Sequence, residues 1–221
     1  DNLLTVDFIC HGTPSPKVWG MYLDEVVKEV KSISSVEFRN KDKGWKDFSF
    51  NLRFNEGDKT ASMLSPYKQN HYMKAFLRDI ILRPSCYECK AKGCSSQSDI
   101  TIADFWGVHN IYPEMDDDKG TSLILLNTDN GIDTLDKKQV ISAETNFKRI
   151  KSLNPACYLS PKEPSKRDEF FARLDNENMI ELINECTRPT SKQRLYKIVY
   201  DCTLLIYNML DRVVKVKKSF N

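Results

Sequence analysis

Three of the chain's seven cysteines lie within nine residues, and thiols this close together can bind a metal ion or an iron–sulfur cluster. Two residues separate Cys86 from Cys89, so one tight turn presents both sulfur atoms. Cys94 follows beside a glycine, where the chain can turn back toward the pair. A strong zinc signature would contain a second Cys-x2-Cys pair. The spacing therefore leaves zinc, an iron–sulfur cluster and no metal open.

A second group of candidate residues follows the first apolar segment. Leu3 to Cys10 reads LLTVDFIC and predicts a buried strand, and HGTPSP after it predicts a turn. Cys10 can supply a further sulfur ligand through a tertiary contact. The small residues Gly12 and Thr13 let backbone N–H groups approach an anionic group. His11 suits either a proton donor or a hydrogen-bonded turn residue.

Composition limits the class of protein. The chain has 221 residues, 40% of them hydrophobic, which is enough to bury a core. Its net charge is +2, which gives no general attraction to nucleic acid. No apolar run approaches the roughly 20 residues of a membrane span. Seven cysteines without a signal peptide favour a reducing compartment, so we expect a cytoplasmic protein. Because the chain starts at Asp1 directly on a strand, we expect it to be a piece of a longer protein.

The remaining patterns predict a mixed α/β fold. A helix should follow the first turn, with Ser15 as its N-cap and Pro16 as its first residue. Further segments alternate or run apolar in the manner of strands, and others carry helical stripes. The expected strands are 34–40, a hairpin turning at Glu56–Gly57, 98–107, 121–128 and an edge strand at 140–145; the expected helices are 16–31, 70–82, 129–138 and 191–218. The predicted architecture is a central mixed sheet with flanking helices over residues 1–150, and a helical C-terminal extension over residues 151–221.

Four segments together resemble one known family. They are VDFICHGTPSPKVW, ILRPSCYECKAKG, SDITIADFWG and DDDKGTSLILLNT, between Val6 and Thr128. In this order they resemble the C-terminal domain of the coenzyme F420 hydrogenase/dehydrogenase beta subunit family. The resemblance implies an oxidoreductase domain of an iron–sulfur flavoprotein. Such a domain passes electrons between a [4Fe-4S] cluster, FAD and a soluble acceptor. That acceptor is coenzyme F420 in some members, but the bacterial branch, which this chain resembles more closely, often lacks it.

The resemblance also implies partners and ligands. Relatives often carry ferredoxin-like motifs before this domain, so we expect such an N-terminal region here, and a redox partner protein. Cys10, Cys86 and Cys89 are the implied cluster ligands, with Cys94 or the preceding segment as source of the fourth. Many relatives have a cysteine after the Gly-Thr-Pro turn, where this chain has Ser15.

We expect the cofactor to bind at the end of the 98–107 strand. Asp104 and Trp106 there offer a carboxylate and an aromatic face to an isoalloxazine or a nucleotide. The alternative roles are a turn cap for Asp104 and core packing for Phe105 and Trp106.

Two other functions remain open from the residues themselves. One is a non-redox binding module with a structural zinc or thiol site, which a single Cys-x2-Cys pair would serve. The other is a partner of transferase type that acts on a nucleotide or sugar, because loops at strand ends in α/β folds suit such ligands.

Overall fold

The computed structural model describes residues 3–27, 32–56, 59–93, 95–135, 139–192, 194–200 and 202–203. The chain forms two compact units, residues 1–186 and residues 187–221. The predicted domain boundary near residue 150 stays a prediction. In the second unit, described residues 194–200 are helical, and most of the predicted helix 191–218 lies outside the described residues.

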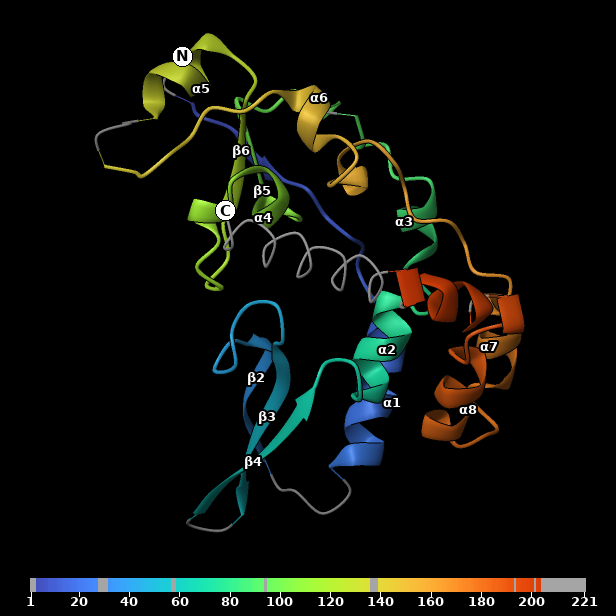
Figure 1. Cartoon of the computed structure of the whole chain (residues 1–221). Helices are drawn as coiled ribbons and strands as arrows, with labels where there is room; N and C mark the ends of the chain where they lie inside the picture. Colours follow the sequence, from blue (N-terminus) through green and yellow to red (C-terminus); the bar gives the residue numbers. More distant parts are fainter. Residues whose placement is uncertain are drawn as a thin grey trace, which may run out of the picture. The chain divides into compact units, whose positions relative to one another are not determined.

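The first unit is a mixed α/β fold, as the sequence predicts, and its described strands form two three-stranded sheets (Figure 1). One sheet is mixed and has the order β1-β5-β6, with β1 parallel and β6 antiparallel to β5. The other is antiparallel and has the order β2-β3-β4. The strands are β1 (Val6–Phe8), β2 (Ser32–Asn40), β3 (Ser49–Glu56), β4 (Lys59–Pro66), β5 (Ile100–Asp104) and β6 (Ser122–Leu126).

Helices connect the strands and continue after them. In the first half of the unit they are α1 (Pro16–Val26), α2 (His71–Leu77), α3 (Pro84–Tyr87) and α4 (Val108–Ile111). After β6 follow α5 (Asp129–Thr134), α6 (Phe147–Ile150), α7 (Arg167–Arg173) and α8 (Met179–Cys186), and the 3-10 turns are η1 (Pro113–Met115) and η2 (Pro155–Cys157). None of the described helices is long and apolar enough to cross a membrane.

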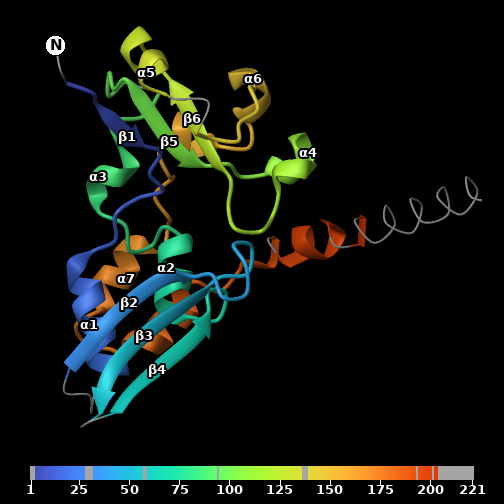
Figure 2. The same cartoon turned by 90° about the vertical axis from the view of Figure 1, so that its left-hand side faces the viewer.

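The larger core lies on one face of the antiparallel sheet (Figure 2). Phe50 and Leu52 alternate along β3 with polar neighbours, so their side chains share one face and are fully buried. Helices α1, α2, α7 and α8 cover that face. Val18 and Tyr22, four residues apart on α1, are buried there as the helical spacing predicts. Residues 167–186 therefore belong to this core.

The smaller core lies beside the mixed sheet. Phe105, Val108, Leu123 and Ile150 bury their side chains together. Side-chain hydrogen bonds also connect the segments next to β1, β5 and β6. The Asp99 carboxylate accepts hydrogen bonds from the Thr5 backbone N–H, the Thr5 hydroxyl and the Thr128 hydroxyl. These donors, the Thr128 hydroxyl foremost, lower the pKa of Asp99 to about 2.

Several predicted elements differ from the structure. The buried strand predicted for residues 3–10 is shortened to β1, where the side chains of Val6 and Phe8 are 54% and 68% exposed. Residues 140–145 form no strand; the chain there runs without regular pairing, and the Glu144 carbonyl accepts a hydrogen bond from the Tyr112 hydroxyl instead. Helix α2 ends at Leu77 rather than Leu82, because Asp79 takes a left-handed conformation with φ of 62°. Residues 81–83 then pair with the turn after β1. Whether residues 140–145 pair as a strand, and where α2 ends, depends on which other segments they contact. Local residue spacing carries no information about such contacts.

Candidate functional site

The turn after β1 is fastened to the segment that leads into the cysteines. The Ser15 N–H donates to the Ile81 carbonyl at 2.7 Å, and the Arg83 N–H donates to the Thr13 carbonyl at 2.8 Å. Pro84 then begins α3, where its fixed φ suits the first helical position and its missing N–H costs nothing. This pairing brings the Cys86 turn to the end of β1, as the predicted shared site requires.

Cys86 lies against the backbone of Thr13. The Thr13 N–H donates to Cys86 Sγ at 3.3 Å. Cys86 Sγ also lies 3.8 Å from the Thr13 carbonyl oxygen, which accepts from the thiol when the sulfur is protonated. Thiolate sulfur is the form of cysteine that binds metal, and here a backbone N–H group lies within hydrogen-bond distance of the sulfur atom. The turn of small residues thus points a backbone donor at the Cys86 sulfur.

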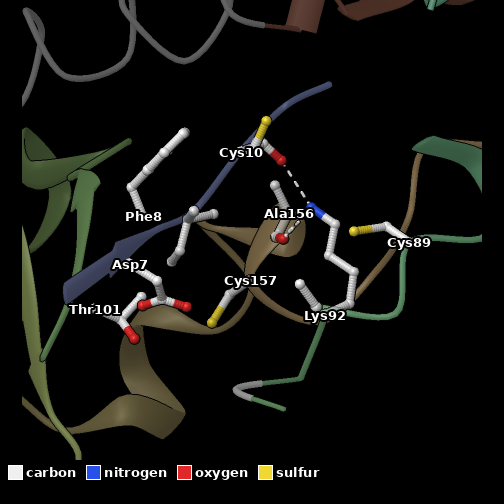
Figure 3. Close-up of a pocket in the computed structure, with 10 residues that line it drawn as sticks. Asp7, Phe8, Cys10, Cys89, Lys92, Thr101, Ala156 and Cys157 are labelled. Atoms are coloured by element: carbon white, nitrogen blue, oxygen red, sulfur yellow. Dashed lines mark hydrogen bonds between the residues drawn. The ribbon is translucent and has the colours of Figure 1, made fainter. Parts of the chain in front are cut away.

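Cys10 and Cys89 line one small cavity together with Cys157 (Figure 3). Its volume is about 40 Å³, which leaves room for little more than water. In Figure 3 the sulfur atoms of Cys10 and Cys157 point in different directions rather than at one centre. Cys157 is buried, at 6% exposure.

Lys92 joins the three segments that form this cavity. Its ammonium group donates to the Cys10 carbonyl and to the Ala156 carbonyl, both at 2.7 Å (Figure 3). The Gly93 N–H donates to the Cys157 carbonyl at 2.9 Å, and the Cys89 N–H donates to Ser160 Oγ at 3.1 Å. The cysteine turn is therefore held on both sides through backbone groups, which leaves the cysteine sulfur atoms out of these contacts.

The predicted ligands Cys10, Cys86 and Cys89 lie on neighbouring segments but do not form a coordination shell. Within the described ranges, no three His, Cys, Asp or Glu side chains are grouped so that they could hold one metal ion. Cys94 lies outside the described residues. The sulfur donors suit a soft metal centre by their chemistry.

His11 and Gly12 have local roles in the same turn. His11 Nε2 lies 2.9 Å from Asp79 Oδ1, and the His11 ring packs on Phe76 with centroids 4.9 Å apart. A Cβ on Gly12 would come within 2.7 Å of Leu82 Cδ1, so close packing favours glycine there. These contacts hold the turn against the end of α2.

Asp104 and Trp106 belong to a second cluster, at the end of β5. Asp104 Oδ2 lies 2.5 Å from Arg39 Nη1. The Arg39 guanidinium stands over the Trp106 ring at 5.8 Å, and Trp106 packs on Trp45 with centroids 4.5 Å apart. Trp106 remains 44% exposed, so one aromatic surface is available to a ligand. Phe105 takes the alternative role, because it is 5% exposed and lies in the smaller core.

The basic loop before β3 and the acidic loop before β6 contact each other. The Trp45 N–H donates to the Asp118 carbonyl at 2.7 Å, and the Lys46 N–H donates to Asp118 Oδ1 at 3.0 Å. Lys46 Nζ lies 2.5 Å from Asp116 Oδ2, and this pairing raises the pKa of Lys46 and lowers that of Asp116. Both loops carry structural contacts here.

Several of these contacts were missed by sequence reasoning. Cys157 lies 63 residues after Cys94 in no recognisable motif, so nothing in the sequence connects it to the cysteine turn. Nothing in the sequence indicates that Lys92 contacts Cys10 and Ala156. One sequence feature could have predicted the contact between Trp45 and Trp106: the segments Lys41–Lys46 and Asp116–Asp118 carry opposite charges.

Comparison with known proteins identifies the family. Residues 1–148 match the family model for the C terminus of the coenzyme F420 hydrogenase/dehydrogenase beta subunit. No curated protein and no solved structure matches the chain. The matched region contains the turn after β1, the Cys86 turn, and strands β5 and β6. Because the match covers 148 of the 221 residues, the chain belongs to the family of C-terminal domains of coenzyme F420 hydrogenase/dehydrogenase beta subunits.

Proposed function

We propose that this domain transfers electrons within an oxidoreductase, and that Cys86, Cys89 and Cys10 help to bind a [4Fe-4S] cluster beside an FAD. The observation that carries the proposal is the meeting of the Cys86 turn with the end of β1 in a chain of a redox-enzyme family. A bound cluster would supply one-electron transfer, and a flavin would connect it to two-electron chemistry. Cys94 is our candidate for the fourth ligand.

Groups of the protein around the cysteines would tune the properties of a bound cluster. The Thr13 N–H donates to Cys86 Sγ, and hydrogen bonds of this kind to cluster sulfurs raise the reduction potential. Lys92 holds the loop near Cys10 and places a positive charge close to the cysteines. The cavity beside Cys10 and Cys89 is small, so our proposal includes an outward movement of residues 86–93 when the cluster is assembled.

For the flavin, we propose the neighbourhood of Asp104 and Trp106, with Gly12 and Thr13 near an anionic group. The exposed Trp106 ring suits stacking on an isoalloxazine. Arg39 is held beside it by Asp104 and can face a phosphate. His11 is a candidate proton donor. We further propose that a ferredoxin-like region and a redox partner protein exchange electrons with this domain; coenzyme F420 is not required as the acceptor.

The decisive experiment measures iron, acid-labile sulfide and zinc per chain in anaerobically purified protein. The Cys86→Ser/Cys89→Ser variant removes the pair, and Cys202→Ser is the matched control because Cys202 is an exposed cysteine of the second unit. We expect about four irons and four sulfides per chain, as a [4Fe-4S] cluster requires. Both should be lost in the double variant and retained in the control.

If the purified protein instead holds one zinc per chain, and the double variant loses it, the cysteines bind a structural zinc ion rather than a cluster. The small cavity favours this second candidate function, because a single ion needs less space than four irons. Iron retained in the double variant would contradict the ligand assignment, and neither metal in the purified protein would contradict both functions.

A further inference from the structure

Strand β6 lies at the edge of the mixed sheet, and part of its backbone faces away from β5 (Figure 2). The Asn127 N–H donates to the Asp99 carbonyl, and the Phe105 N–H donates to the Thr121 carbonyl. In the register of β5 with β6 these are hydrogen-bonded pairs, and such pairs alternate with non-bonded ones along an antiparallel ladder. The N–H and C=O groups of Ser122, Ile124 and Leu126 therefore point away from β5, and no other strand of the described chain pairs with them.

A groove of about 1060 Å³ runs along this edge. Its other wall is formed by residues 140–147, which belong to no strand and lead into α6 (Figure 1). The sequence predicts an edge strand in this segment at residues 140–145, and the groove shows why none forms: the segment stands off from β6. Apolar side chains dominate the lining, among them Phe105, Ile124, Val140, Ile141 and Phe147.

The strand edge lacks the usual protection against pairing. Natural edge strands are often shielded by a lysine, a proline or a bulge, whereas β6 reads SLILL and keeps a continuous register with β5. Ile124 remains 39% exposed on it. Exposed edges of this kind accept an added strand, in which main-chain hydrogen bonds give affinity and alternate side chains give specificity.

The charged residues of the groove indicate which class of ligand fits it. Its charged lining residues are Glu114, Asp117 and Glu144, and no Lys, Arg or His is among the lining residues. A flavin dinucleotide or another phosphate-bearing ligand would meet acidic groups there, which disfavours it. A segment that combines apolar residues with basic ones fits both the apolar lining and the three carboxylates.

We propose that the β6 groove is a docking site for an extended segment of a partner protein, in which apolar residues alternate with polar and basic ones and which adds to β6 as a strand. Five residues of β6 span about 17 Å, so a segment of about five to seven residues covers the edge. The site differs from the cysteine site and does not depend on the proposed electron transfer.

The first test needs no ligand. Residue-resolved hydrogen exchange of the free protein should show a faster-exchanging amide at Ile124 than at Leu123 and Leu125, whose N–H groups bond to β5. Equal protection of the three amides would mean that the chain's own 140–145 segment, or a second copy, already covers the edge, and would overturn the proposal. Sedimentation of the same sample separates these two occupants, because only the second is a dimer.

The second test measures binding of a fluorescein-labelled Lys-Val-Thr-Val-Lys-Val-Thr peptide by anisotropy. Ile124→Pro removes an outward N–H without touching the β5 ladder, a position where edge strands tolerate proline. We expect saturable binding that weakens about tenfold in Ile124→Pro, as the loss of one good hydrogen bond implies. Ile124→Thr is the matched control: it retains the N–H and should stay close to wild type.

Two further probes keep this test decisive. Replacing both lysines of the peptide by glutamate should weaken binding, because the groove is acidic. If Ile124→Pro does not fold, peptides methylated on alternate backbone nitrogens replace it, and at least one of the two should lose binding. No saturable binding of the basic peptide, equal binding of the acidic one, or full binding by Ile124→Pro and both methylated peptides would overturn the proposal.

Discussion

At the scale of single residues, Lys92 is the group that assembles the cysteine site. Its ammonium donates to carbonyl groups of two segments that are far apart in the sequence, at Cys10 and Ala156. A charged donor to a carbonyl is a stronger hydrogen bond than a neutral one. Removing it leaves two carbonyl oxygens without this donor. The position of Cys89 relative to Cys10 therefore depends on a lysine that carries no ligand atom.

We predict that Lys92→Met exposes the thiols of the cavity. Modification of Cys10 and Cys89 by a thiol reagent should become several-fold faster, because the turn is no longer held against β1. The measurement is the rate of labelling at each cysteine by peptide mapping, in a Cys202→Ser background that removes an exposed competing thiol. Lys90→Met is the control, since Lys90 is exposed on the same turn. Equal labelling rates in the two variants would show that Lys92 does not hold the loop.

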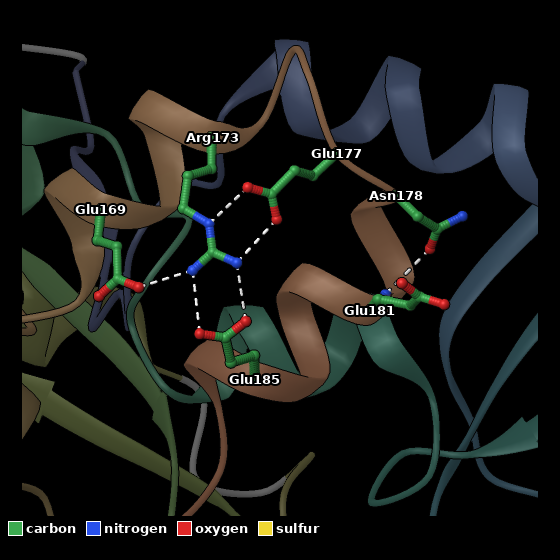
Figure 4. A network of polar contacts seen from close by, with 6 residues as sticks. All are labelled: Glu169, Arg173, Glu177, Asn178, Glu181 and Glu185. Atoms are coloured by element: carbon green, nitrogen blue, oxygen red, sulfur yellow. Dashed lines mark hydrogen bonds and ion pairs between the residues drawn. The ribbon is translucent and has the colours of Figure 1, made fainter.

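At the scale of elements, one arginine joins α7 to α8 (Figure 4). The Arg173 guanidinium pairs with Glu169 on α7, with Glu177 between the helices and with Glu185 on α8, at 2.7 to 2.8 Å. These pairs are exposed, so each is screened by water. Their geometry nevertheless places three carboxylates around one cation, and the hydrogen bonds from Arg173 lower the pKa of Glu177.

We predict that Arg173→Gln lowers stability at neutral pH, because three glutamates are then left facing one another. A carboxylate whose pKa is depressed in the folded state contributes stability above its ordinary value of 4.5, and this contribution is lost as pH falls through the folded value. The difference between wild type and variant should therefore shrink below about pH 4.5. Denaturant unfolding at pH 7 and pH 4 measures it.

The control for that experiment is Lys17→Gln, which removes a single exposed pair with Asp175. Its effect at pH 7 should be the smaller of the two. An equal loss of stability in the two variants, or a loss in Arg173→Gln that does not depend on pH, would contradict this prediction. The arrangement of three glutamates around one arginine would then add nothing to stability.

At the scale of the first unit, the 41–46 loop meets the 113–120 loop, and Gly120 permits the contact. Its φ of +103° is a conformation that residues with side chains rarely adopt. A Cβ at this position would come within 2.8 Å of Trp45 Cδ1. The pairing of Trp45 with Trp106, and with it the candidate flavin surface, therefore depends on a glycine outside both tryptophan segments.

We predict that Gly120→Ala destabilises the protein by about 1–3 kcal/mol, the usual cost of a strained backbone position. Tryptophan fluorescence should change at the same time, because Trp45 must shift. Gly20→Ala is the matched control: Gly20 lies within α1 with open space around it, and alanine there should stabilise by about 0.5–1 kcal/mol. Chemical denaturation followed by fluorescence measures both. A neutral effect of Gly120→Ala would contradict the packing of Gly120 against Trp45.

Local patterns predicted the elements whose causes are local. Ser15 and Pro16 begin α1 as predicted, and the alternation of Phe48 to Phe54 along the chain produces a strand of an antiparallel hairpin. The family followed from four short segments in order. Residues 140–145 were the failure: an apolar alternating segment becomes a strand only when it meets an edge, and here a groove separates it from β6.

The sequence by itself determined the mixed α/β class, the family and the presence of a cysteine turn, because propensity, periodicity and motif order are properties of neighbouring residues. Only the tertiary structure decided that Cys157 lies beside that turn, that Lys92 bonds to Cys10 and Ala156, that Trp45 packs on Trp106, and that the strands divide into two sheets. These contacts connect segments tens of residues apart. Their existence depends on how the whole chain packs, which no local pattern encodes.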